Sequence, residues 1–330
     1  MGHVCNTLRR MVQPGDSGFA WNIVIVEVLA VAAVVAAFEG RRRFRKRQQE
    51  ERDERPPQSE KVLRPAGYSA NRRIFDLSDR LLFALLEACA GAVVFGLLCI
   101  ALYPLAVNLV LGRISFAQLW AAPICYLWPQ ALGMSTLALL LTIWRFSVAS
   151  KLDQELRNWR FGMRGEQAVA EKLASPDVSR AGYIVFHDLP GDGAWNIDHV
   201  VVGPGGVFVL ETKTRPRRAA TRNQEEQTVT FDGRTLQFPW CDDPKAAKQA
   251  ERNAKWVQKL ITDFAPNDIL VQPVIVVPGW YVETLGNYPV KAMNAKYLVG
   301  YLAGSKPRFS AEQLRPIIRR IDERCRDLEF

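Results

Sequence analysis

Apolar residues are concentrated in three long runs in the first half of the chain. These runs cover residues 19–38, 81–111 and 117–144, and each contains few charged positions. A helix needs about 20 apolar residues to cross the hydrocarbon core of a bilayer. Each run reaches that length, so the pattern predicts three transmembrane helices.

The first run is open to a second interpretation, a cleaved signal peptide. Against this, the run is long for the apolar region of a signal peptide, and no A-x-A site precedes a plausible mature start. The sequence RRRFRKR follows directly, and residues 39–80 hold 13 Lys and Arg. Basic segments stay in the cytoplasm. We therefore expect an external tail at 1–18, a basic cytoplasmic linker at 39–80, an external loop at 112–116 and a cytoplasmic domain at 145–330.

This topology describes a multi-pass protein of the inner (plasma) membrane whose soluble domain faces the cytoplasm and whose helices contact the lipid bilayer. Glu27 lies inside the first run, where an acidic side chain costs about 2.5–3.5 kcal/mol on insertion scales. Glu27 is therefore functional, protonated, or paired with a polar group such as Gln130.

The second half of the chain has the pattern of a soluble domain. Alternation, turn and capping signals predict these elements in order: a helix at 165–174, strands at 183–189, 197–203 and 206–214, a hairpin around Asp232-Gly233, a helix from Asp243-Pro244 to Phe264, a strand at 269–279, and a helix that Ser310 caps. This order predicts an α/β domain with a mixed sheet flanked by helices.

Charge and cysteine content narrow the function only slightly. The net charge of +9 is shared about equally between the first 144 residues and the remainder, which permits binding of nucleic acid without requiring it. None of the six cysteines forms a CxxC pair, which excludes a zinc ribbon by spacing. No Walker A sequence occurs, so an ATP-driven motor is not expected.

Three ionisable residues flank a predicted hairpin in NIDHVVVGPGGVFVLETK. Glu211 and Lys213 are two residues apart on one strand and therefore share a face. Pairing outward from the GPGG turn brings Asp198 roughly opposite Glu211. Two neighbouring carboxylates raise each other's pKa, and a hard cation such as Mg²⁺ relieves the repulsion. The lysine can then orient water and stabilise charge on a phosphate, which indicates metal-assisted hydrolysis of a phosphodiester.

Spacing alone also allows a structural interpretation. The same three residues fit a cross-strand ion pair on a solvated sheet face, and many soluble proteins contain this spacing by chance. His199 follows Asp198 and faces the other side of the strand, where it either packs in the core or contacts a substrate.

Four stretches of sequence resemble the nuclease-related domain (NERD), a branch of the PD-(D/E)xK nuclease superfamily. They are GMRGEQAVAEKL, FHDLP, NIDHVVVGPGGVFVLETK and DDPKAAKQAERNAKW. The resemblance covers roughly residues 159–300. It implies a restriction-endonuclease-like fold and a nuclease that uses Mg²⁺ or Mn²⁺ on nucleic acid, with DNA favoured over RNA.

The resemblance assigns roles residue by residue. Asp198 and Glu211 match the metal ligands, Lys213 matches the catalytic lysine, and Glu166 matches the acidic residue of the first core helix. Gln249 resembles the glutamine of the following helix.

Two departures from the family pattern remain. Four residues separate Gln249 from Pro244, more than the family pattern has. Ile197 precedes Asp198, so the literal PD is absent.

The arginines after Lys213 are candidate contacts to nucleic acid, since phosphates attract such residues. They are Arg215, Arg217, Arg218 and Arg222. A solvated loop is the alternative interpretation. The sequence leaves open two other functions for the whole domain: a module that binds nucleic acid without cutting it, and a membrane scaffold that recruits a partner.

Overall fold

The computed structural model describes residues 39, 43, 61–112, 127–193, 195–217, 227–265 and 269–329. The expected tail and first transmembrane helix, with Glu27, lie outside these residues. The chain divides into two units, of which one contains Asp76–Glu155 and the other joins Arg55–Phe75 to Leu156–Phe330.

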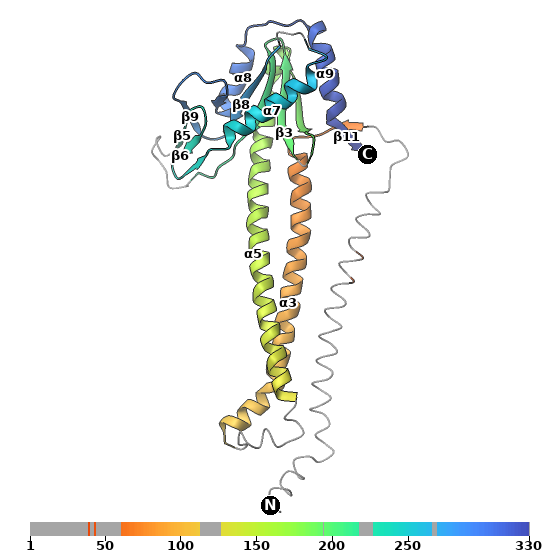
Figure 1. Cartoon of the computed structure of the whole chain (residues 1–330), viewed down its shortest axis with the longest axis vertical. Coiled ribbons are helices and arrows are strands. Elements are labelled where there is room, and N and C mark those ends of the chain that lie inside the picture. The colour runs from red at the N-terminus through yellow and green to blue at the C-terminus, as the bar shows by residue number, and fades with distance from the viewer. Residues whose placement is uncertain are drawn as a thin grey trace, which may run out of the picture. The chain divides into compact units, whose positions relative to one another are not determined.

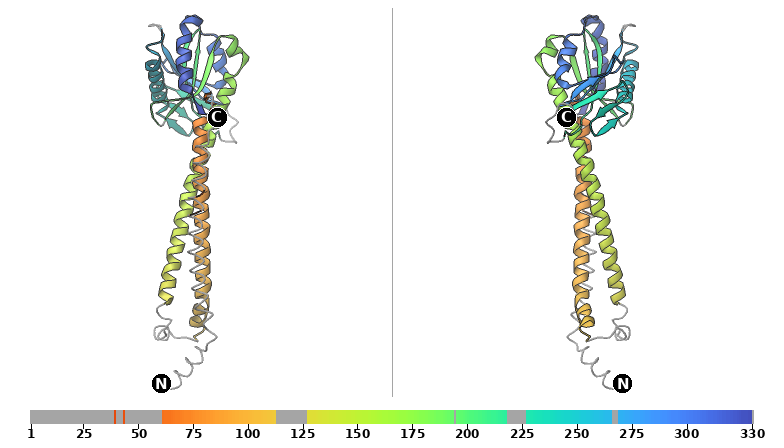
Figure 2. Two further views of the ribbon diagram at one scale, coloured as in Figure 1. Left: turned by 90° about the vertical axis from the view of Figure 1, so that its right-hand side faces the viewer. Right: turned by 90° about the vertical axis from the view of Figure 1, so that its left-hand side faces the viewer.

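Two long helices begin in one unit and end in the other: α3 (Tyr68–Val110) and α5 (Leu127–Leu173). By length and composition, two helical stretches within them could cross a membrane, and only 17% of the most apolar window of each is buried. Within the first unit, Arg145 of α5 forms a 2.7 Å ion pair with Glu87 of α3. Both helices are continuous in Figures 1 and 2.

The limits of these helices differ from the predicted spans. α3 begins at Tyr68, before the expected start at 81, and the first part of the expected span at 117–144 lies outside the described residues. α5 has no proline after Pro129, so it runs past Arg145 and includes most of the helix predicted at 165–174. In the second half of the linker expected at 39–80, the structure instead has β1 (Lys61–Leu63) and the first turns of α3. Both form part of the α/β unit.

A five-stranded mixed sheet forms the centre of the α/β unit, as the sequence predicted. Its strands are β2 (Ile184–Pro190), β3 (Asn196–Gly203), β4 (Gly206–Thr212), β8 (Val271–Val276) and β10 (Lys291–Met293). Their order is β10-β8-β4-β3-β2. β2, β3 and β4 form an antiparallel meander, and β4, β8 and β10 are parallel. The predicted GPGG turn is confirmed, because Gly203 pairs with Gly206.

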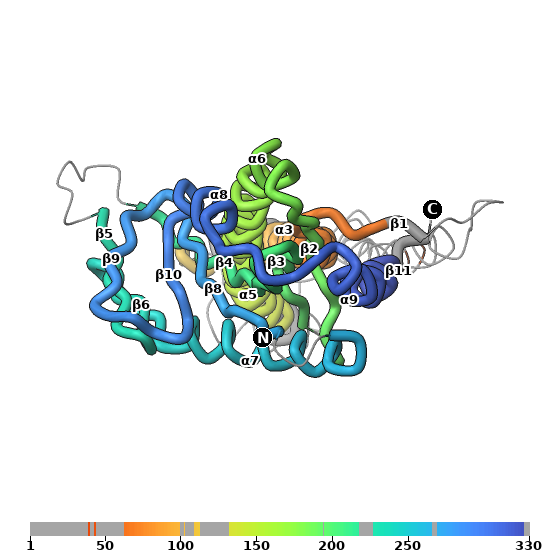
Figure 3. Tube along the Cα trace, turned by 90° about the horizontal axis from the view of Figure 1, so that it is seen from above, coloured from red at the N-terminus to blue at the C-terminus, as the bar shows by residue number. Residues whose placement is uncertain are grey.

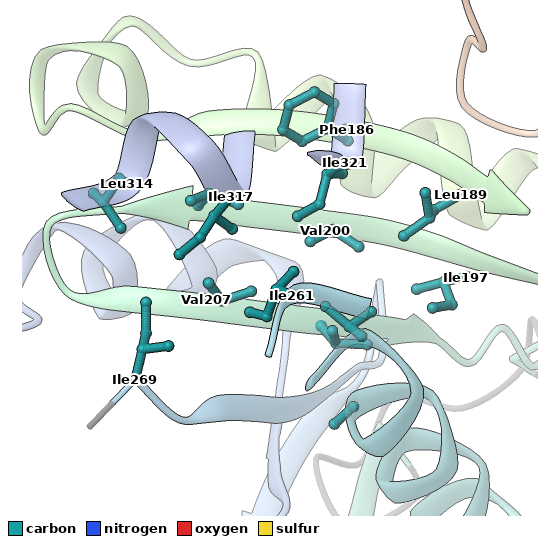
Figure 4. Packing of buried hydrophobic residues seen from close by; sticks show 14 of the residues in the cluster. Phe186, Leu189, Ile197, Val200, Val207, Ile261, Ile269, Leu314, Ile317 and Ile321 are labelled. Atoms are coloured by element: carbon teal, nitrogen blue, oxygen red, sulfur yellow. The ribbon is translucent and has the colours of Figure 1, made fainter. Parts of the chain in front are cut away.

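Helices cover both faces of this sheet, which explains why β3 and β4 are apolar along nearly their whole length. On one face, α7 (Ala246–Ile261) and α9 (Ala311–Cys325) pack on side chains such as Val200 and Val207 (Figures 3 and 4). On the other face, the end of α5, α6 (Pro176–Arg180) and α8 (Ala295–Ala303) pack on Val201 and Phe208.

A second, smaller sheet packs against the start of α7. Its order is β7-β6-β5-β9, with β5 (Thr228–Phe231), β6 (Leu236–Phe238), β7 (Cys241–Asp243) and β9 (Tyr281–Thr284). The predicted hairpin around Asp232 is confirmed. Its carboxylate accepts hydrogen bonds from the backbone of Arg234 and Thr235, and Gly233 takes a φ of 89°.

On the α7 face, α9 begins with a side-chain cap, whereas the N-cap of α7 is Lys245, which makes no side-chain cap hydrogen bond, and not Asp243 as predicted. The Asp243 carboxylate accepts from the backbone N–H groups of Lys245 and Ala246, although α7 itself begins at Ala246, two residues later than predicted. Ser310 and Gln313 form a reciprocal capping box on α9, as the sequence predicted for Ser310. After α9, β11 (Arg326–Glu329) pairs antiparallel with β1.

Candidate active site

The hairpin register brings Asp198 and Glu211 to corresponding positions on β3 and β4. The last paired residues of the ladder are His199 and Leu210, so the next positions outward are Asp198 and Glu211. The Thr212 N–H donates a 2.7 Å hydrogen bond to Asp198 Oδ2. This bond fixes the Asp198 carboxylate at the strand end, where the sequence had placed it.

Lys213 connects β4 to α7. Its Nζ donates to Glu211 Oε1 and to Gln249 Oε1, both at 2.8 Å. The backbone N–H of Lys213 donates to Val276 O on β8 at 2.9 Å, which holds the residue beyond the end of its strand. The structure therefore brings Gln249 to the lysine, despite its longer separation from Pro244.

Asn253 is a site residue that the sequence analysis missed. Its Nδ2 donates to Glu211 Oε2 at 2.8 Å, and the side chain is fully buried. Asn253 lies four residues after Gln249, so both face β4 from the same side of α7. That spacing was the available signal: a second polar residue one helical turn after Gln249, in a helix whose other buried positions are alanine, valine and isoleucine.

Glu166 reaches the site from α5, where the chain packs tightly against the end of β4. A Cβ on Gly165 would overlap the hydroxyl of Thr214. Glu166 Oε2 is buried and has no hydrogen-bond partner among the described residues. Burial, followed by repulsion from Asp188 and Glu211, raises the pKa of Glu166 from 4.5 to about 8.

The pKa values of the other two carboxyl groups, Asp198 and Glu211, are also raised. Burial is the largest cause of the raised pKa of Asp198, and repulsion from Glu211 and Glu166 adds to it. Burial also raises the pKa of Glu211, although Lys213 opposes the shift. The sequence argument named mutual repulsion as the cause, whereas desolvation contributes more.

Two histidines of β2 and β3, the half-buried His187 and the buried His199, contact each other. His199 and His187 place their Nδ1 atoms 2.8 Å apart, and burial lowers the pKa of both rings. One ring must donate and the other accept, so the contact requires at least one neutral imidazole. His199 is thus a hydrogen-bonded residue inside the domain.

The contacts of Asp188 hold parts of the fold together. Its carboxylate is fully buried and accepts hydrogen bonds from Arg64, from the backbone and hydroxyl of Ser69, and from Asn196. Its φ of 51° is a conformation that Asp tolerates better than most residues. These contacts attach the segment before α3 to the end of β2.

The arginines after Lys213 divide into two groups. Arg215 forms a 3.1 Å ion pair with Asp243, and its carbonyl accepts from Trp280 Nε1. Arg217 is exposed and donates to Gln227. Arg218 and Arg222 lie outside the described residues, so their predicted contacts to nucleic acid stay predictions.

The side chains present are of the type that binds a hard divalent cation. Asp198, Glu211 and the unpaired oxygen of Glu166 are carboxylate groups of the kind that could hold such an ion, and Mg²⁺ commonly needs only one or two of these plus waters. Within the described part of the chain, however, no three His, Cys, Asp or Glu side chains are grouped as a complete metal site. Any ion here would therefore need water or phosphate oxygens as further ligands.

Comparisons with known proteins agree with the resemblance seen in the sequence. Residues 161–278 match the family model NERD, described as the nuclease-related domain. Neither a comparison with curated proteins nor one with solved structures found a match. The matched residues contain Glu166, the β3–β4 hairpin and α7, and the mixed-sheet architecture is consistent with a restriction-endonuclease-like fold. The chain therefore carries a segment that is similar to the nuclease-related domain.

Proposed function

We propose that the α/β domain is a metal-dependent nuclease that hydrolyses phosphodiester bonds in nucleic acid, DNA in preference to RNA. The observation that carries the proposal is the network at the strand ends: Lys213 is held between Glu211 and Gln249, with Asp198 opposite on β3. Lys213 donates one hydrogen bond to an uncharged amide and one to a carboxylate. Because an ammonium has three N–H donors, one donor remains for a phosphate oxygen.

Each group has a role in this proposal. Asp198 and Glu211 would hold Mg²⁺ or Mn²⁺, which would supply Lewis-acid stabilisation of the phosphate when bound. Lys213 would stabilise negative charge on the reacting phosphate. Glu166, which holds a proton up to about pH 8 in the metal-free protein, would exchange protons with water at the site.

The test uses the full chain in detergent with labelled DNA and RNA, in Mg²⁺, in Mn²⁺ and in excess chelator. We expect cleavage only with metal, and a loss of about 10²–10⁴-fold in Lys213→Ala, the range for removal of a positioned catalytic group. Lys248→Ala is the control, since Lys248 is an exposed lysine on the same helix as Gln249.

Cleavage that persists in chelator or in Lys213→Ala would overturn the proposal. The incomplete metal grouping gives one specific reason to consider a second function, binding of nucleic acid without cleavage. A salt-dependent complex with no product in either metal would identify that function.

We also propose that α3 and α5 cross a membrane as a hairpin. The two helices expose many large apolar side chains, including Leu137, Leu140 and Ile143, which water would not favour. β1, which precedes α3, pairs with β11 at the other end of the chain, so the segments before α3 and after α5 must lie on the same side of the membrane.

With the basic segment at 39–47, such a hairpin would have the α/β domain in the cytoplasm and the turn near Gly112 outside. An impermeant thiol reagent applied to intact cells should then label a cysteine introduced at Gly112 and spare one introduced at Lys306. The reverse labelling pattern would exclude this topology.

A further inference from the structure

Arg252 differs from Arg215 and Arg324, because no carboxylate among the described residues forms an ion pair with it. Arg215 is paired with Asp243, and Arg324 is paired with Asp192. Arg252 is exposed, and its side-chain hydrogen bonds go to one neutral acceptor, Asn253 Oδ1, from Nε at 3.3 Å and from Nη2 at 3.1 Å. Three of its five N–H donors are left for another ligand.

The Arg252 guanidinium lies over an aromatic ring. The Arg252 guanidinium carbon lies 4.7 Å from the centroid of the Trp195 ring. Stacking on a ring uses the face of the guanidinium and leaves its N–H donors free in the plane. The cation is therefore held in place without being neutralised.

Trp195 is itself held on two sides. A Cβ on Gly191 would lie 2.5 Å from Cε2 of the Trp195 ring, so the ring packs directly against the backbone there. On its edge, Trp195 meets Trp256 at 5.6 Å in a T-shaped contact. Trp256 donates from Nε1 to Asp192 at 2.8 Å. The ring is thus a fixed support for Arg252 and is not free to stack on a base.

Asn253 connects Arg252 to the acidic residues. Its Oδ1 accepts from Arg252 and its Nδ2 donates to Glu211 Oε2, which fixes the orientation of the amide because an arginine can only donate. The guanidinium is therefore two hydrogen bonds away from Glu211. Arg252 also acts electrostatically on the Glu211 carboxylate, so a phosphate bound by Arg252 would lie near one bound at Glu211 and Lys213.

We propose that Arg252, supported by Trp195, binds the backbone phosphate of a nucleic-acid strand next to the phosphate that is cleaved. This inference rests on the proposed nuclease function and names a substrate-binding residue for that site. A contact to the backbone carries no base information, so it would strengthen binding of all sequences equally.

The experiment measures binding by fluorescence anisotropy, with the full chain in detergent and labelled single-stranded and duplex DNA. All proteins carry Lys213→Ala to prevent cleavage, and the salt concentration is varied. Arg252→Gln should weaken binding about tenfold for every sequence and reduce the slope of log Kd against log salt by about one. Lys255→Gln removes the same charge from another exposed position of α7 and should change binding much less.

Two results distinguish failure of the Arg252 proposal from failure of the nuclease proposal. If the parent protein binds DNA and Arg252→Gln behaves like Lys255→Gln, the role of Arg252 is excluded while the nuclease proposal stands. If the parent protein binds no nucleic acid in any metal, the nuclease proposal itself fails. Arg252→Lys adds a third comparison: it keeps the charge and loses the planar stack, so its affinity should fall between those of the parent and Arg252→Gln.

Discussion

At the scale of single residues, burial of Glu166 makes its protonation sensitive to pH in the neutral range. Its pKa is raised from 4.5 to about 8, so the folded protein keeps a proton in this window that the unfolded chain releases. The contribution of Glu166 to the free energy of unfolding therefore falls as pH rises from 4.5 to 8, with no further loss from this group above pH 8. Glu166→Gln cannot ionise, so its stability should depend less on pH.

We expect Glu166→Gln to be more stable than the parent by about 1–3 kcal/mol above pH 8 in chelator, because a buried, unpaired charge is removed. Guanidinium unfolding at several pH values, followed by tryptophan fluorescence, measures this. Glu171→Gln changes an exposed glutamate of the same helix and should leave the pH profile as it was. Equal profiles for Glu166→Gln and the parent would show that Glu166 is already ionised at neutral pH.

At the scale of elements, the position of Glu166 depends on how closely α5 approaches β4. Gly165→Ala should destabilise the domain by about 1–3 kcal/mol, because its Cβ would overlap Thr214 in a tightly packed contact. Gly162→Ala is the matched control, since no atom lies within 4 Å of its added Cβ. An alanine in this helix should instead stabilise by about 0.5–1 kcal/mol. Two substitutions three residues apart thus have opposite predicted signs, and one thermal-unfolding experiment compares them.

The same scale shows what the sequence could and could not predict. The β3–β4 hairpin follows from its continuous apolar runs and its GPGG turn, so Asp198, Glu211 and Lys213 could be placed on neighbouring strand ends before any coordinates. The contact between Arg252 and Trp195 could not be predicted, because it depends on the path of the loop after β2. Three-residue strands such as β1 also carry no recognisable alternation, and β1 pairs with a segment near the other end of the chain.

At the scale of the whole molecule, the α/β domain is assembled from two chain segments that are separated by the long helices. The Arg64–Asp188 ion pair connects them, with Asp188 fully buried and the Arg64 side chain only 12% exposed. Removing one partner of a buried pair leaves an uncompensated charge, which typically costs about 3–5 kcal/mol. Arg64→Ala should therefore destabilise the domain by that amount in the full chain.

A double-mutant cycle separates the loss of the pair from other effects of Arg64→Ala. In Asp188→Asn the buried charge is absent, so adding Arg64→Ala should cost clearly less than it does in the parent. If the two substitutions are simply additive in unfolding measurements, the pair does not connect the segments. A positive coupling would also predict that a fragment beginning at residue 145 is less stable than the full chain, because it would keep Asp188 buried while losing Arg64, Ser69 and the β1–β11 pairing.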